Sequence, residues 1–312
     1  MKSSPKSALA FELLMAAVVV VWGLNYVNVK FGTLVWSPFA FTWVRFLLVA
    51  LISAIWLVCR RRPLPSGRDL VRYLLIGALG VSFYQILFTA GDHNTTASAT
   101  GFLLALSPAF TVLYMAFVRR QPHRLAQWLG VGLSLVGVAL LVAAEPSSPF
   151  APNPLLGDGL DLLAALTWAA YTVWSLPLVE RRDPFEVMLW STVFGFLVLC
   201  LALPVAGLPR LSGIPLASWL AVAFAVGPVT LFGLGVWQVG VRHLGPTAVS
   251  VYVNAMPVVG AVAAYLLLGE GVNWLEGVGA VVVLTGLVLT RRPLRRARVA
   301  VGQPTVDVEA GP

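Results

Sequence analysis

GDHNTTASATGFLLALSP, at residues 91–108, reappears in altered form at residues 240–257 as GVRHLGPTAVSVYVNAMP. The two stretches lie 149 positions apart, and the same shift aligns later residues without a gap. The identical pairs are Gly91 and Gly240, Ala99 and Ala248, Pro108 and Pro257, Gly130 and Gly279, Leu135 and Leu284, Gly137 and Gly286, and Leu140 and Leu289. A fixed shift of this kind predicts two copies of one structural unit.

Composition predicts that the chain lies in a membrane. Of its 312 residues, 59% are hydrophobic and 11% are charged, whereas soluble domains carry about 25% charged residues. So few charges could not cover a water-exposed surface, and lipid is therefore the expected solvent. Cys59 and Cys200 lie in apolar runs without metal-ligand spacing, and we interpret both as small packing residues.

Ten windows are apolar and long enough to cross a bilayer as helices, which takes about 20 residues each. They are Leu9–Val29, Pro38–Cys59, Leu70–Thr89, Thr95–Val118, Leu125–Ala144, Leu160–Val179, Val187–Ala206, Leu216–Val236, Thr247–Leu268 and Val272–Thr290. Each copy holds five spans, an odd number, so the second copy enters from the opposite side. We therefore expect an all-α integral membrane protein with ten transmembrane helices in two inverted five-helix repeats.

The expected domains follow from these spans. The first repeat covers residues 1–144 and the second covers residues 160–292. Residues 145–159 are rich in proline and predict an extended, exposed linker outside the cytoplasm. Residues 293–312 lack periodicity and predict a disordered cytoplasmic tail.

Lys and Arg gather at one set of span ends. They precede the first span and follow the even-numbered spans, whereas the other face has only Lys30 and Arg210. Basic residues collect in the cytoplasm, so we expect a multi-pass protein of a bacterial-type plasma (inner) membrane with both termini cytoplasmic. The net charge of +8 then reflects topology and contact with membrane lipid, and nucleic-acid binding is not expected.

Polar and aromatic residues within the spans predict a substrate cavity, because polar groups in a bilayer are costly. Trp22, Asn25 and Tyr26 lie at i, i+3 and i+4, on one helical face. Trp168 and Tyr171 repeat this spacing at an offset of 146. The other residues assigned to the cavity are Tyr84, Gln85, Phe88, Ser98, Trp237, Gln238, Tyr252 and Asn254. The alternative is helix packing through side-chain hydrogen bonds.

Prolines occupy matched positions deep in spans four and nine, at Pro108 and Pro257. A proline frees a backbone carbonyl and bends its helix. We expect paired kinks beside a site, with kinks that have no substrate role as the alternative.

Four charged or titratable residues have two interpretations each. Arg45 could bind an anionic substrate group, although a structural role is favoured. Asp92 and His93 could relay protons or occupy a polar span end. Glu12 could couple protons, although its place in the first turn of a helix also suits an acid.

Motifs for enzymes and ATP-driven pumps are absent from the sequence. There is no P-loop, no His-Glu-x-x-His and no Gly-x-Ser-x-Gly, so we expect a non-enzyme without cofactor or metal. Spans five and ten are glycine-rich and nearly free of polar residues. They are expected to stand outside the cavity, or to join a homodimer where the protein is not a monomer.

The chain resembles members of the drug/metabolite transporter superfamily, specifically its ten-span EamA-type permeases. The matching pieces are Trp22–Asn25, Arg45-Phe46, Thr95–Ser98 leading to Pro108, Ala248 to Pro257, and Leu268-Gly269-Glu270. Arg120-Gln121 departs from the family's Gly-Glu after the first-half proline helix. The resemblance implies outward movement of small organic metabolites, amino acids or drugs.

We therefore expect a secondary transporter that exports a small-molecule substrate by alternating access, with amino acids and amphiphilic or aromatic compounds as the substrate class. Proton antiport and uniport both remain open. The alternatives are a membrane-embedded enzyme that acts on lipid, and an ion channel, which would need a continuous polar pore lining.

Overall fold

The computed structural model describes residues 5–118, 120, 125–143, 150–271 and 274–290 of the chain, and every regular element among them is helical. The expected tail at 293–312 and the first third of the expected linker, residues 145–149, lie outside these described residues. Eight described helical stretches are long and apolar enough to cross a membrane, and two shorter apolar helices lie at Leu125–Leu140 and Trp274–Gly286. Together they correspond to the ten expected spans.

The first half runs from α1 to α7. Its elements are α1 (Pro5–Thr33), α2 (Pro38–Cys59), α3 (Gly67–Gly77), η1 (Ala78–Phe83), α4 (Tyr84–Asn94), α5 (Ala97–Leu104), α6 (Ser107–Phe117) and α7 (Leu125–Ala143). Spans three and four are therefore composite: α3, η1 and α4 form the third, and α5 and α6 form the fourth.

The second half repeats this plan. Its elements are α8 (Pro154–Val179), α9 (Pro184–Leu199), η2 (Cys200–Ala202), α10 (Leu203–Ala206), α11 (Leu216–Phe224), η3 (Ala225–Leu234), α12 (Gly235–Leu244), α13 (Pro246–Ser250), η4 (Val251–Ala255), α14 (Met256–Leu268) and α15 (Trp274–Thr290). Spans eight and nine are composite, as three and four are in the first half, and span seven also consists of three elements, α9, η2 and α10.

Capping residues set several helix starts. Asn153 caps α8 through a hydrogen bond from the backbone N–H of Leu156, and Pro154 occupies the first turn. The sixth span therefore begins at Pro154 rather than Leu160, and residues 154–159, expected as extended linker, are helical. Ser37 before Pro38 caps α2 in the same way.

The helices of the two halves pack in corresponding ways. α1 lies against α14 and η3, and its counterpart α8 lies against α6 and α4. α2 packs on its counterpart α9, and α7 packs on its counterpart α15. Equivalent helices of the two halves therefore make equivalent contacts, as a twofold relation between inverted halves predicts. The protein is thus an all-α membrane protein with two inverted five-helix repeats.

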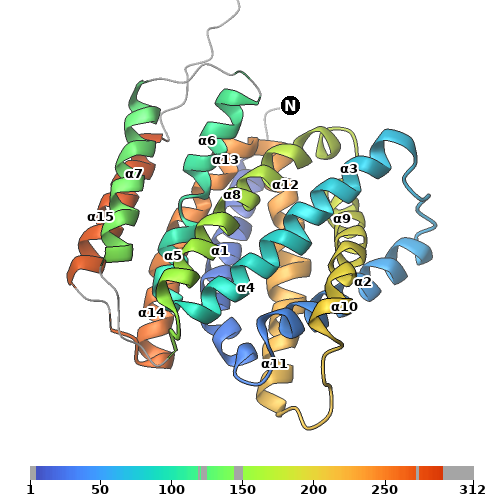
Figure 1. Ribbon diagram of the computed structural model, residues 1–312. Coiled ribbons are helices and arrows are strands. Elements are labelled where there is room, and N and C mark those ends of the chain that lie inside the picture. Colours follow the sequence, from blue (N-terminus) through green and yellow to red (C-terminus); the bar gives the residue numbers. More distant parts are fainter. Residues whose placement is uncertain (1–4, 119, 121–124, 144–149, 272–273, 291–312) are drawn as a thin grey trace, which may run out of the picture.

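α7 and α15 stand side by side at one edge of the molecule (Figure 1). Small residues let them approach closely: a Cβ added at Gly137 would meet Val283 and Gly279, and one at Gly286 would meet Gly130 and Ser134. The remaining helices form the body that holds the large buried core (Figure 1).

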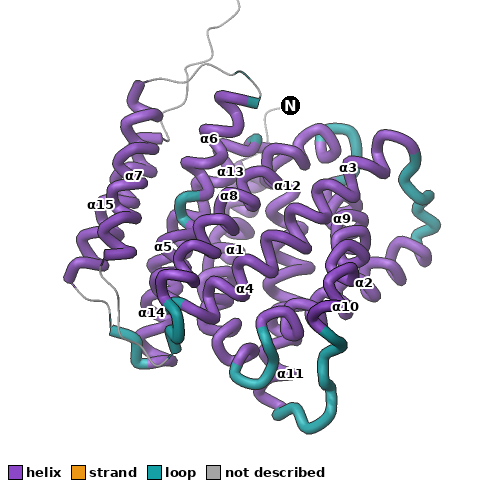
Figure 2. The backbone as a smooth tube through the Cα atoms, in the orientation of Figure 1, coloured by secondary structure: helices purple, strands orange, loops and turns teal. Residues whose placement is uncertain are grey.

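Matched irregularities interrupt the body helices. α6 begins next to Pro108 and α14 next to Pro257, each after a short break or 3₁₀ stretch (Figure 2). Spans three and eight carry π-helical segments instead, η1 and η3. π-helical turns often occur at functional sites, and nothing in the sequence indicated them.

Candidate functional site

A cavity lies in the middle of the helical body. Its walls come from α1, α2, α4, α8, η3 and α14, and the lining residues are Trp22, Asn25, Tyr26, Arg45, Tyr84, Gln85, Phe88, Trp168, Val229, Leu234 and Met256. Its volume is about 30 Å³, room for about two water molecules. A larger solute therefore needs the walls to move apart.

Aromatic rings form most of the cavity wall. Trp22 contacts Trp168 with ring centroids 5.3 Å apart, and Tyr84 contacts Trp168 at 4.7 Å. Tyr84 stacks on Phe88 at 5.8 Å with an interplanar angle of 8°. Tyr26 then meets Phe88 edge-on at 6.1 Å. Each such pair contributes about 0.5–1.5 kcal/mol beyond the area it buries, so the rings form a connected wall.

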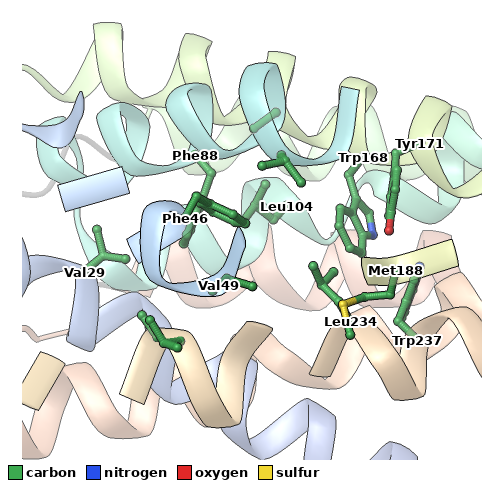
Figure 3. Close-up of a cluster of buried hydrophobic side chains, with 14 of the residues drawn as sticks. Val29, Phe46, Val49, Phe88, Leu104, Trp168, Tyr171, Met188, Leu234 and Trp237 are labelled. Carbon is green, nitrogen blue, oxygen red and sulfur yellow. The ribbon is translucent and has the colours of Figure 1, made fainter. Parts of the chain in front are cut away.

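Trp237 and Tyr171 lie behind this wall rather than in the cavity lining. Figure 3 shows Trp168 and Tyr171 side by side, pointing toward Met188 and Trp237. The Gln238 amide donates a hydrogen bond of 2.5 Å to the Tyr171 hydroxyl, and both residues are buried, as is Trp237. These residues therefore support the Trp168 ring from the side away from the cavity.

Arg45 is the charged group of the cavity lining. Its Nε and Nη2 donate to Thr230 Oγ1 at 2.9 and 2.8 Å, and its Nη1 donates to Gln85 Oε1 at 3.2 Å. The side chain is 2% exposed, and no acidic side chain pairs with it in the described part of the chain. In the described chain, this cation is held by the neutral oxygens of Thr230 and Gln85 and by the ring of Phe46, whose centroid lies 5.0 Å from the guanidinium carbon.

The π-helical segment η3 places the acceptor for Arg45. Thr230 Oγ1 donates to the carbonyl of Ala225, five residues earlier, at 2.6 Å. Its lone pairs then face Arg45. Trp22 is anchored to the same segment, since its Nε1 donates to the carbonyl of Val229 at 2.8 Å. One irregular turn thus orients two residues of the cavity wall.

Other residues assigned from the sequence lie away from the cavity. Ser98 and Asn254 are buried outside its lining. Tyr252 donates to Glu12 Oε2 at 2.7 Å, near the end of the bundle where α1 begins. His93 is half-buried at the end of α4.

A second polar group was missed by the sequence interpretation. It lies at the end of the bundle where α1 terminates and α8 begins, which is called the outer end because the pattern of basic residues predicts that it faces outside. Its charged members are Lys30, Asp92, Asp158, Asp161 and Glu270, all buried. The sequence had singled out Asp92 together with His93, but not with these charged neighbours. Asp161 carried a usable signal, because it is an acid within a hydrophobic window.

The fold and the cavity together define a helical membrane protein of the transporter type. The sequence model of the EamA-like transporter family matches residues 9–143 and again residues 155–292, and the chain belongs to this family. The resemblance stated from the sequence motifs is confirmed.

Relatives of similar length carry transporter names. A "Probable amino-acid metabolite efflux pump" of Escherichia coli strain K12 is 31% identical and aligns over 93% of this chain and 98% of its own. The protein of the same name from Salmonella typhimurium is 30% identical, with 91% and 96% covered. The "Uncharacterized inner membrane transporter YedA" of E. coli K12 is 25% identical, with 88% of each chain covered.

One solved structure, described only as "Crystal structure of protein", shares the fold. Its TM-score is 0.64 at 18% identity, and the match covers 90% of this chain and 96% of that one. At this identity the likeness concerns the fold alone.

Proposed function

We propose that the protein is a secondary transporter that exports small organic solutes carrying both a carboxylate and an apolar or aromatic group, such as amino acids. The observation that carries this proposal is the buried guanidinium of Arg45 in an aromatic-lined cavity without an acidic partner in the described residues. The names of the relatives from E. coli and S. typhimurium support export as the direction.

Arg45 supplies the anion recognition. A guanidinium presents its donors in a planar fork that matches a carboxylate. Burial without a counter-charge is costly, and the acceptors on Thr230 and Gln85 compensate only in part. An incoming carboxylate would provide the missing negative charge. This favours a binding role for Arg45 over the structural role that the sequence favoured.

The aromatic wall supplies the rest of the recognition. Trp22, Trp168, Tyr84 and Phe88 offer ring faces to an apolar side chain. Ring faces also attract an ammonium group. An amino acid presents all three features, which the cavity matches with one cation and several rings.

Alternating access is the mechanism we propose. The cavity is too small for such a solute in this conformation, so binding and release require opening toward one side at a time. Breaks beside Pro108 and Pro257 and the matched segments η1 and η3 give each half its own flexible points. Inverted halves that exchange their conformations would produce the two access states.

The test uses purified protein in liposomes and exchange of a radiolabelled aromatic amino acid. Competition by the free acid is compared with its amide and its decarboxylated amine. We expect the free acid to compete about tenfold better, the value of one lost charge-assisted hydrogen bond. Arg45→Gln should remove this difference. The exposed Arg210→Gln is the matched control. Equal competition by acid and amide in the wild type would contradict the proposal.

A further inference from the structure

Two buried carboxyl groups belong to one cluster at the outer end of the bundle. Asp92 on α4 and Asp161 on α8 are both 0% exposed, and they interact electrostatically. Thr100 Oγ1 donates to Asp161 Oδ2 at 2.7 Å. By distance and angle, the other Asp161 oxygen and both oxygens of Asp92 accept no hydrogen bond among the described residues, although the Thr100 hydroxyl also lies close enough to Asp92 to interact with it. Buried polar atoms are seldom left in this state.

A glycine lets the two helices that carry these acids pack closely. A Cβ added at Gly91, directly before Asp92, would overlap the carboxylate of Asp161. Asp161 therefore fits against α4 only because position 91 has no side chain.

Charged and titratable groups on the neighbouring elements of the described chain surround this pair. α1 contributes Lys30 and Tyr26, α8 also contributes Asp158, and Glu270 follows α14. His93 is the neighbouring titratable residue on α4, while Arg45 of α2 interacts with Tyr84 in the cavity. The Lys30 ammonium donates to the carbonyls of Thr95 and Phe150. Within the described part of the chain, Lys30 is the cation that interacts with both Asp92 and Asp161, and two carboxylates beside one ammonium are costly in a buried site unless a proton is bound.

The opposite end of the molecule shows that the fold does not require these acids. At the internal offsets of 146 and 149, Asp161 corresponds to Met15, Asp92 to Val241 and Thr100 to Val249. Gly240, the counterpart of Gly91, lies against Val249 and Met15. An apolar cluster therefore packs the equivalent junction at the opposite end. Helix packing alone does not explain the acids at the outer end.

We propose that Asp92 and Asp161 form a proton-binding pair that couples solute export to proton entry. No group of three or more His, Cys, Asp or Glu side chains in the described chain is arranged to hold a metal ion, which favours a proton over a metal cation as the ligand. This inference rests on the proposed transport function.

The position of the pair explains how coupling would work. Asp92 lies four residues, about 6 Å of helix, beyond Phe88 of the cavity wall. The pair takes up one proton from the outside when the outer end opens. The singly protonated pair keeps one negative charge, which the Lys30 ammonium offsets, and this neutralised cluster then permits the outer end to close. Solute that arrives in the cavity from the cytoplasm displaces the proton inward.

Infrared spectroscopy tests proton binding without any solute. Purified wild-type protein and Glu180→Gln, an exposed carboxyl at the other end of α8, should show the absorption of a buried protonated carboxyl at neutral pH. Asp92→Asn and Asp161→Asn should each lose it, and Asp92→Glu should restore it. An unchanged band in both asparagine variants overturns the proposal. Size-exclusion chromatography confirms that each variant is folded.

Transport in liposomes containing a pH-sensitive dye tests coupling. Wild-type protein should move protons when solute is added, and a pH gradient should drive solute accumulation. Asp92→Asn and Asp161→Asn should lose accumulation but retain solute exchange. Exchange by wild type without proton movement, or accumulation driven by a sodium gradient instead, overturns the coupling and leaves the transport function standing. If wild type exchanges no solute at all, the proposed function fails, while the infrared band still decides whether the pair binds a proton.

Discussion

Trp22 and Trp168 meet edge to face, with ring centroids 5.3 Å apart and planes at 83°. The two residues occupy equivalent positions of the two repeats, at the offset of 146. Equivalent residues can touch only near the axis that relates the two halves. The cavity that both residues line is therefore at the centre of the repeat, where relative movement of the halves would change its shape.

Removal of either tryptophan should weaken solute binding. We expect Trp22→Ala and Trp168→Ala to raise the KM for exchange about tenfold, because each loses a ring face and aromatic pairs of about 0.5–1.5 kcal/mol. Exchange kinetics in liposomes measures the effect. Trp274→Ala removes a tryptophan that is 78% exposed and should leave KM unchanged. Wild-type KM in both cavity variants would mean that these rings only pack helices.

Loss of the Thr230 hydroxyl should destabilise the protein. Thr230→Val leaves two Arg45 donors without their acceptor, which costs about 1–3 kcal/mol. We expect a lower melting temperature in detergent, measured as the loss of monodisperse protein on heating. Thr285→Val is the matched control, since Thr285 is exposed on α15 and also donates to a helix carbonyl. Equal melting of the two variants would show that Arg45 does not depend on Thr230.

Covalent closure of either end should stop net transport. Thr95→Cys with Asp158→Cys joins two residues that hydrogen-bond at 2.7 Å at the outer end. Glu12→Cys with Tyr252→Cys joins the 2.7 Å pair near the other end. Both pairs connect the two halves, so a bifunctional thiol reagent should trap opposite states. Full transport with one end crosslinked would favour a channel, and reduction of the crosslink is the control for general damage.

Thiol labelling of intact cells should establish orientation. Cys59 and Cys200, the free cysteines of the described chain, are first replaced by serine. We then expect an impermeant reagent to label Ser212→Cys in the loop between α10 and α11, because this loop lies on the face with few basic residues. Ser66→Cys, next to the basic residues that follow α2, should react only after permeabilisation. Its side chain makes no cap hydrogen bond, so the change is mild. Labelling of position 66 but not of position 212 in intact cells would show that the topology is the reverse of the expected one.

The sequence predicted the architecture well because the membrane simplifies the problem. A bilayer requires long apolar helices, and hydropathy reveals them directly. The start of α8 was misplaced by six residues, because proline-rich sequence predicts a loop even where Asn153 and Pro154 form a helix cap. The π-helical segments could not be foreseen, since they depend on packing against neighbouring helices rather than on local composition.

For the site, the sequence by itself determined which residues are polar or aromatic within apolar spans, and which of them repeat. Trp22, Asn25, Tyr84 and Trp168 were found in this way, and they line the cavity. The tertiary structure alone decided that Tyr171 and Trp237 stand behind the wall, and that the partners of Arg45 in the described chain are neutral. It also joined Asp92 to Asp161, which lie 69 positions apart in the chain. The physical reason is that the cost of a buried polar group can be read from sequence, whereas the partner that offsets this cost is chosen by helix packing.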